Sequence, residues 1–242
     1  MSIEASLVRE FAPTGVLRAS LNLGNPVLAH SRTAPERPAG VSIDLAREFA
    51  RQLGVQVVFI EFDTPGKSVE AVTREQADIG FLAVDPERAK GVHFTPPYIE
   101  IEGCYLVPEG SPIVRNEEVD TPGTKVVVGA GSAYELFLNR HLAHATLVRV
   151  PTSEGVVDAM LDEGLPVAAG VRQQLEADAL RLGGVRLLPE RFMVIRQAML
   201  MPRGRSPLAK ALLDAFIDEA KRSGFVKDAL ERHGIMGARI AD

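Results

Sequence analysis

The feature that most constrains the fold is an alternation of strand-like and helix-like segments that runs through the chain twice. The strand-like segments are short and rich in β-branched residues, and the helix-like segments carry apolar residues every three to four positions. This order is typical of a parallel sheet with helices packed on its faces. The strands expected on these grounds are 16–22, 55–62, 77–84, 124–130, 146–150 and 166–170.

Helices are expected between these strands and after the last of them. In the first helix, apolar residues recur from Ile43 to Leu53, with Ser42 as the N-cap and Gly54 as the C-terminal stop. The remaining helices are expected at 67–76, 132–142, 153–164, 171–183, 207–222 and 225–233.

Two further apolar strands, 101–111 and 195–206, connect the two halves of the chain. Two crossings are what a discontinuous first lobe requires. The sequence therefore predicts an α/β fold of two lobes joined by a hinge of two crossing strands. The first lobe is expected at 1–100 plus 199–242 and the second at 101–198. Clefts between hinged lobes are common sites for small ligands.

Charge and composition exclude several classes of function. The 242 residues carry a net charge of -5 and no block rich in Lys and Arg, so nucleic acid is not an expected partner. No apolar run reaches the ~18–20 residues that span a bilayer. We expect no cofactor and no metal, because His141 and His144 lack a Cys, Asp or Glu spaced to complete a zinc site. The single Cys104 cannot form an intrachain disulfide.

Four segments, in this order and spacing, resemble the amino-acid family of solute-binding proteins, the two-lobed type II receptors that feed ABC importers. They are GVSIDLAREFARQLG, DIGFLAVDPERAKGVHFTPPY, VVVGAGSAYE and LDEGLPVAAGVRQQ. The resemblance covers roughly residues 15–235. It implies a periplasmic binding protein-like type II fold, a small-molecule ligand, an ABC permease as partner and a periplasmic location.

Location and oligomeric state are open on the residues themselves. The first fifteen residues have no apolar secretory region, so a cytoplasmic location is the alternative to a periplasmic one. We expect a monomer.

The first-lobe ligand residues follow from the resemblance, which implies that Arg88 grips the carboxylate of the ligand. A guanidinium offers a fixed two-pronged donor set that fits a carboxylate. The alternative is an arginine that only pairs with Asp85 or Glu87. Asn22 and Asn25 either line the floor of the site or only build the turn after the first strand.

In the second lobe, Gly131 and Ser132 are expected to face the ligand. Glycine before a helix lets backbone N–H groups approach an anion, and the helix dipole adds to the attraction. The alternative for Ser132 is a plain helix N-cap.

Departures from the family pattern bear on the ligand. The acidic residue that holds a ligand ammonium in amino-acid receptors falls on Arg172, or within one residue of it. Ala83 replaces an expected hydroxyl, Asp85 stands where a second Thr is usual, and Lys67 replaces an aromatic neighbourhood. Together, Arg88, Arg172 and Lys67 would make the cleft cationic, which predicts a small organic anion such as a carboxylate as the ligand. An Asp85 side chain that points inward would still admit an amine. The alternative for Arg172 is a solvent-facing helix residue.

The expected mechanism is closure of the lobes on the ligand, followed by recognition of the closed form by a permease. We do not expect an enzyme. No nucleophile–base pair, phosphate loop or metal cluster is recognisable in the sequence. One alternative is a lyase on the same fold, resembling periplasmic dehydratases such as cyclohexadienyl dehydratase, with Asp85 or Glu135 as the acid that protonates a leaving hydroxyl. Another alternative is a cytoplasmic ligand-binding or sensor module.

Overall fold

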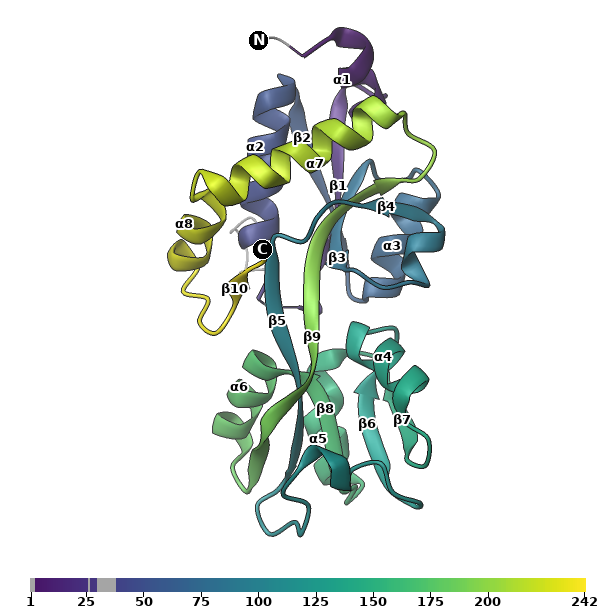
Figure 1. Cartoon of the computed structure of the whole chain (residues 1–242), viewed down its shortest axis with the longest axis vertical. Helices are drawn as coiled ribbons and strands as arrows, with labels where there is room; N and C mark the ends of the chain where they lie inside the picture. Colours follow the sequence, from purple (N-terminus) through teal and green to yellow (C-terminus); the bar gives the residue numbers. More distant parts are fainter. Residues whose placement is uncertain (1–2, 26, 30–37) are drawn as a thin grey trace. The chain divides into compact units, whose positions relative to one another are not determined.

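The computed structural model describes residues 3–25, 27–29 and 38–242, and it divides into two compact units. Unit 1 comprises Met1–Glu100 and Arg196–Asp242, and unit 2 comprises Ile101–Ile195. The chain leaves unit 1 along strand β5 (Ile99–Pro108) and returns along strand β9 (Val185–Pro202) (Figure 1). Both units combine strands with helices, which confirms the predicted α/β class.

The sheet of unit 1 has the strand order β2-β1-β3-β9. Strand β1 runs parallel to β2 and β3, and β9 runs antiparallel to β3. Because parallel strands end at the same edge, the residues that follow β1, β2 and β3 gather there. The strands are β1 (Val16–Asn22), β2 (Gln56–Phe62), β3 (Ile79–Ala83), and two short ones, β4 (Val92–Phe94) paired with β9 and β10 (Arg239–Ile240) paired with β5.

Helices cover this sheet through apolar contacts. Ala71 and Val72 of α3 belong to a buried cluster with Leu82 of β3. On α2, the Phe49 ring lies 4.9 Å from the rings of Phe11 and Phe216, measured between centroids, and so ties together three helices. Figure 1 shows α7 crossing α2, which it contacts through Phe216. The helices of unit 1 are α1 (Ala5–Phe11), α2 (Val41–Leu53), α3 (Pro65–Thr73), α7 (Pro207–Arg222) and α8 (Phe225–Arg232).

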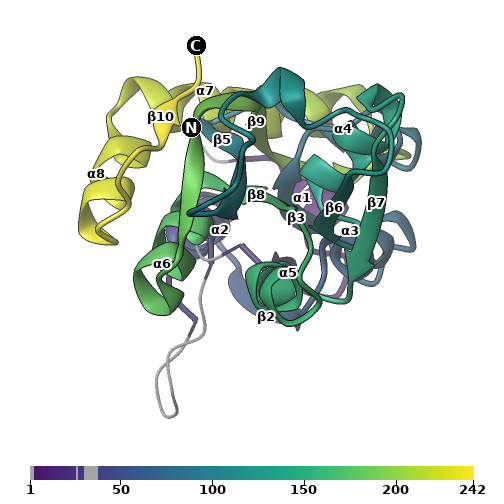
Figure 2. The ribbon, with the colours of Figure 1, turned by 90° about the horizontal axis from the view of Figure 1, so that it is seen from below.

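Unit 2 has the strand order β5-β8-β6-β7, with β6 parallel to both β7 and β8 and with β5 antiparallel to β8. Helices α5 and α6 share one buried cluster with Val127 of β6 and Cys104 of β5, and α4 lies on the other side of β6 from α5 (Figure 2). The elements are β6 (Lys125–Gly129), α4 (Ala133–His141), β7 (Thr146–Val150), α5 (Val156–Asp162), β8 (Val167–Val171) and α6 (Arg172–Leu182).

Several predicted element ends differ from the structure, and two of the differences matter here. Ser42 is not the N-cap of α2, because the helix begins at Val41 after Gly40, and the backbone N–H of Ser42 donates to the carbonyl of Leu28 at 3.1 Å. Strand β9 begins at Val185, ten residues earlier than expected. Among the helices of the described residues, none combines the length and apolar character that a membrane span needs.

Candidate functional site

Several of the predicted ligand residues of unit 1 lie where its parallel strands end. Asn22 is the last residue of β1 and Ala83 the last of β3, and Asp85 and Arg88 follow within one turn. Lys67 lies in the first turn of α3, just after β2. The topology therefore brings these residues to one edge of the sheet, as the sequence order requires.

Arg88 is 7 % exposed and opens the short 3₁₀ helix η1 (Arg88–Lys90). Its Nη1 donates to the carbonyl oxygen of Ala83 at 3.0 Å, which fixes the guanidinium against the end of β3. Asp85, 3 % exposed, accepts the backbone N–H of Glu87 at 2.9 Å and that of Arg88 at 3.5 Å. A cation and a carboxylate are thus held side by side in the chain and out of water.

Asn22 and Asn25 both build turns. The Oδ1 atom of Asn22 accepts the N–H of Gly24, and the Oδ1 atom of Asn25 accepts the N–H of Val27, each at 3.2 Å. Both side chains are largely buried. Turn building, one of the two alternatives, is therefore present, and a second role toward a ligand stays a prediction.

Lys67 has a carboxylate partner of its own. Its Nζ lies 2.8 Å from Asp63, and both side chains are 60 % exposed. The positive charge of Lys67, which the sequence argument assigned to the ligand site, is therefore offset by Asp63 of the same unit.

At the corresponding edge of unit 2, Gly131 and Ser132 connect β6 to α4. Ser132 is the N-cap of α4, and its Oγ accepts the N–H of Glu135 at 3.1 Å. Gly131 has φ of 71°, a left-handed conformation that favours glycine. The N-cap role of Ser132 is therefore present, and contact with a ligand stays a prediction.

Arg172 begins α6, where a cation opposes the helix dipole. Its Nε donates to Glu102 at 2.7 Å, and Arg191 donates to the other oxygen of Glu102 at 2.9 Å. Burial alone raises the pKa of Glu102, but the hydrogen bonds from Arg191 and Arg172 outweigh it and lower that pKa. Glu102 therefore stays ionised at neutral pH and offsets the charge of Arg172.

The sequence argument missed several residues that the structure brings to these positions. Glu102 and Arg191 hold Arg172, and only the alternation of polar and apolar residues in β5 hinted at Glu102. Tyr134 donates its hydroxyl to Ser153 at 2.8 Å, and burial raises the pKa of Tyr134. No motif in the sequence pointed to that pair.

Glu135, the second acid considered for catalysis, is 6 % exposed. Its Oε1 accepts Nε of Arg149 at 2.9 Å, and Arg149 also donates to Asn139. His141 stacks on Phe137 instead of facing a metal, and the described part of the chain holds no group of three or more side chains arranged as metal ligands.

Comparison with known proteins identifies the family. The model of the bacterial extracellular solute-binding proteins, family 3, matches residues 25–235. The chain belongs to this family. Its predicted α/β fold of the type II periplasmic binding proteins is confirmed by the solved structures it resembles.

Two of these structures are informative. The solute receptor for L-cysteine of Neisseria gonorrhoeae superimposes with a TM-score of 0.79 and 21 % identity, over 93 % of this chain and 92 % of that one. An ancestral amino-acid-binding protein, described as a precursor of cyclohexadienyl dehydratase, gives a TM-score of 0.77 and 21 % identity, over 93 % and 98 %. At these identities the likeness shows the fold alone.

A curated relative corrects one prediction. The cyclohexadienyl dehydratase of Pseudomonas aeruginosa is 23 % identical over 96 % of this chain and 87 % of its own. The prediction that the chain is not an enzyme was drawn from the resemblance to this family. It was wrong, because a relative that matches nearly the whole chain is an enzyme. Family membership alone does not separate binding from catalysis.

Proposed function

We propose that the protein is a solute-binding protein that captures a small organic anion, either a carboxylate or an amino-acid-like molecule, and delivers it to an ABC permease outside the cytoplasm. The observation that carries this proposal is Arg88, a guanidinium withdrawn from water at the edge where the parallel strands of unit 1 end. Family membership supports the solute-binding role and the extracellular location.

The chemistry of Arg88 suits a carboxylate. A guanidinium carries five N–H donors, so a two-pronged contact with a carboxylate is compatible with the bond from Nη1 to Ala83. Charged hydrogen bonds are worth about 1.5–3 kcal/mol each where water is excluded. Two such bonds supply about 3–6 kcal/mol of the binding free energy of a micromolar ligand, which is about -8 kcal/mol.

The ion pairs of Lys67 and Arg172 weaken the argument that the ligand lacks an amino group. Arg172 was expected to repel an ammonium and Lys67 to add positive charge to the site. Each has a carboxylate partner, Glu102 for Arg172 and Asp63 for Lys67. Asp85 lies three residues before Arg88, and we propose it as the residue that faces the amine of a ligand that carries one. The proposal therefore covers carboxylates with and without an amino group, with Gly131, Ser132 and Arg172 as proposed contacts from unit 2 and Asn22, Asn25, Lys67 and Ala83 as proposed neighbours in unit 1.

Calorimetric titration with L-amino acids, dicarboxylates and monocarboxylates tests the proposal. We expect one class to bind at micromolar concentration and Arg88→Met to weaken it by about a hundredfold or more, since two charged hydrogen bonds are lost. Arg74→Met is the matched control, because Arg74 is an exposed arginine of unit 1 that pairs with Glu70, one turn earlier in the chain. Retained affinity in Arg88→Met, or no binding across the panel, would refute the proposal.

A second candidate function is a lyase of the dehydratase type, and the relative from Pseudomonas aeruginosa favours it. We propose Asp85 as the acid, because it lies beside Arg88 at the end of β3, whereas the carboxylate of Glu135 accepts a hydrogen bond from Arg149. The test is product formation from prephenate or arogenate. Turnover that Asp85→Asn abolishes and Glu135→Gln leaves intact would establish this function, and no turnover at high protein concentration would exclude it.

A further inference from the structure

Gln197 of β9 is the direct neighbour of Ala83 in the sheet of unit 1. Strands β3 and β9 pair antiparallel, with Ala83 opposite Gln197. Side chains directly opposite each other in such a pair lie on the same face of the sheet, about 4.5–5.5 Å apart at Cβ. The carbonyl oxygen of Ala83 also accepts Nη1 of Arg88 at 3.0 Å. Gln197 therefore lies next to the residue that holds the Arg88 guanidinium.

The Gln197 side chain is buried without a hydrogen bond. It is 3 % exposed, and neither of its polar side-chain atoms makes a hydrogen bond with the described residues. The other Ser, Thr, Asn and charged side chains that are buried in the described part of the chain all have a hydrogen-bond partner. Buried polar groups without a partner are rare and cost free energy, so the amide of Gln197 does not serve the stability of the free chain.

The two polar atoms of this amide differ in access. Oε1 of Gln197 has no accessible surface. Nε2 retains accessible surface, so it is the atom that a bound molecule is able to reach. An amide nitrogen donates hydrogen bonds and accepts none. The reachable atom therefore suits an acceptor such as a carboxylate oxygen.

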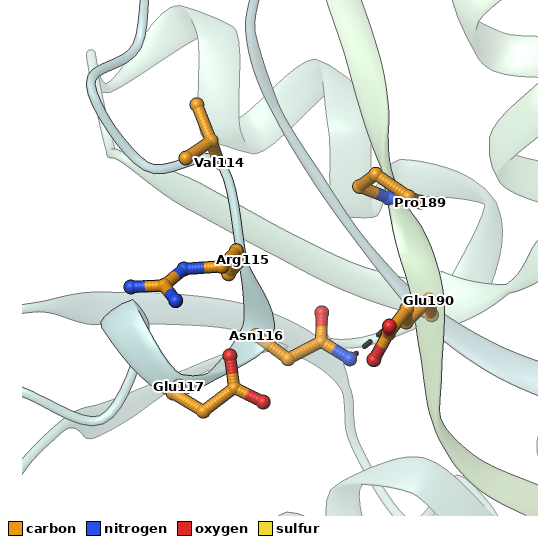
Figure 3. Close-up of a pocket in the computed structure, with 6 residues that line it drawn as sticks. All are labelled: Val114, Arg115, Asn116, Glu117, Pro189 and Glu190. Carbon is orange, nitrogen blue, oxygen red and sulfur yellow. Dashed lines mark hydrogen bonds between the residues drawn. The ribbon is translucent and has the colours of Figure 1, made fainter.

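Asn116 of unit 2 gives a useful contrast. It lines a pocket of about 290 Å³ between the loop after β5 and the first half of β9 (Figure 3). Its Oδ1 is also inaccessible, but its Nδ2 donates to the carbonyl oxygen of Glu190 at 3.2 Å. The chain itself therefore holds the reachable end of the Asn116 amide, whereas it leaves that of Gln197 without a partner.

The end of β3 offers a bound carboxylate no side-chain donor of its own, because Ala83 carries only a methyl group. Gln197 is the neighbour that supplies one. We propose that Gln197 is a further ligand-binding residue, with its Nε2 donating to the same carboxylate that Arg88 binds. This inference rests on the proposed function and deepens it, because it adds an amide to the guanidinium as the donor set for the carboxylate.

Calorimetric titration with acetate, succinate, L-alanine and L-glutamate tests the inference on the native protein, Gln197→Met and Arg88→Met. Each compound carries a carboxylate, and they differ in a second carboxylate or an amino group. For the compound that the native protein binds most tightly, we expect Gln197→Met to weaken binding about ten- to a hundredfold, since one hydrogen bond to a charged acceptor is lost.

Gln56→Met is the matched control. Gln56 is an exposed glutamine at the first residue of β2, so it lies on the opposite edge of the same sheet from the ends of the parallel strands. Its replacement should leave the affinity unchanged.

Thermal unfolding without added compound separates a ligand contact from a structural role. Methionine is close to glutamine in length and flexibility and removes the unpartnered amide, so Gln197→Met should melt at or above the melting temperature of the native protein. A lower melting temperature would show that the amide stabilises the chain itself and would overturn the inference.

The outcomes distinguish this inference from the proposed function. Weaker binding in both Arg88→Met and Gln197→Met, with the stability of Gln197→Met retained, supports it. Weaker binding in Arg88→Met alone overturns the role of Gln197 and leaves the proposed function standing. If none of the compounds binds, or if Arg88→Met binds as the native protein does, the proposed function fails and this inference fails with it.

Discussion

At the scale of single residues, the contact between Gly129, Tyr134 and Ser153 shows how tightly the edge of unit 2 is built. The Tyr134 hydroxyl donates to Ser153 across the end of β6. A Cβ added at Gly129 would lie 2.8 Å from Ser153 Oγ, 2.9 Å from Tyr134 Oη and 3.0 Å from Ser153 Cα. The absence of a side chain at Gly129 is thus what lets these groups meet over the strand.

We predict that Gly129→Ala destabilises the protein by about 1–3 kcal/mol, because overpacking forces the buried pair and the backbone at Ser153 apart. Gly66→Ala is the control of opposite sign. Gly66 lies in helix α3, its added Cβ meets nothing within 4 Å, and alanine there should stabilise by about 0.4–1 kcal/mol. Urea unfolding of both variants measures the difference, and a neutral Gly129→Ala would contradict this account.

The same scale shows where sequence reasoning stops. Arg88 could be placed at a strand end because it follows a fully apolar run by a few residues. The carboxylate partners of Lys67 and Arg172 could not be found in the same way. Glu102 is seventy residues away from Arg172 in the chain, and only the pairing of β5 with β8 brings them together.

At the scale of elements, periodicity located most helices and strands, and the errors have physical causes. Strand β1 was predicted with both ends correct, because apolar residues alternate with polar ones along it and a turn follows. The first part of β9 was missed because Pro189 and two charged neighbours interrupt its apolar pattern. Ser42 was misplaced because a serine before an apolar run resembles an N-cap even when the helix has already begun.

Asp120 connects two elements of unit 2. Its carboxylate accepts the backbone N–H groups of Ala143, His144 and Ala145, at 2.8–2.9 Å, in the segment that joins α4 to β7. The N–H groups of Ala143 and Ala145 lower the pKa of Asp120 below its ordinary value of 3.8. The stabilisation is therefore complete above that value and is lost as the pH falls through the lowered pKa.

We predict that Asp120→Asn costs about 1–3 kcal/mol at neutral pH, because a charged acceptor of three backbone donors is replaced by a neutral one. The difference from the native protein should shrink as the pH falls through the lowered pKa of Asp120, because the native carboxyl is then protonated as well. Asp162→Asn, an exposed carboxylate at the end of α5, should change stability little. Chemical denaturation of the three proteins at several pH values measures this, and a pH-independent loss would rule out the charge as its cause.

At the scale of the whole molecule, a ligand held by the native state alone raises its stability by mass action. At a hundred times the dissociation constant, the gain is about 2.7 kcal/mol. For a chain of this size we predict a rise in melting temperature of about 5–10 °C, at 2–4 °C per kcal/mol. Differential scanning calorimetry with the tightest ligand of the panel measures it. Arg88→Met, with binding weakened about a hundredfold, should show a rise of only about 1–2 °C at the same concentration. A rise equal to that of the native protein would place the ligand away from Arg88.

Closure of the two lobes on a ligand stays a prediction, as do the lobe bounds 1–100 plus 199–242 and 101–198. Small-angle scattering with and without saturating ligand addresses closure, and an unchanged radius of gyration would contradict it.

The return of the chain into unit 1 along β9 has a consequence for biosynthesis. Strand β3 pairs with Leu200 and its neighbours, and helices α7 and α8 follow still later. On a translating ribosome, all residues of unit 2 are synthesised before the part of β9 that pairs with β3 and before helices α7 and α8. Unit 2 is thus able to fold before unit 1 is complete. Until β9 pairs with β3, the amino-terminal part of unit 1 keeps one edge of its sheet unpaired and accessible to chaperones.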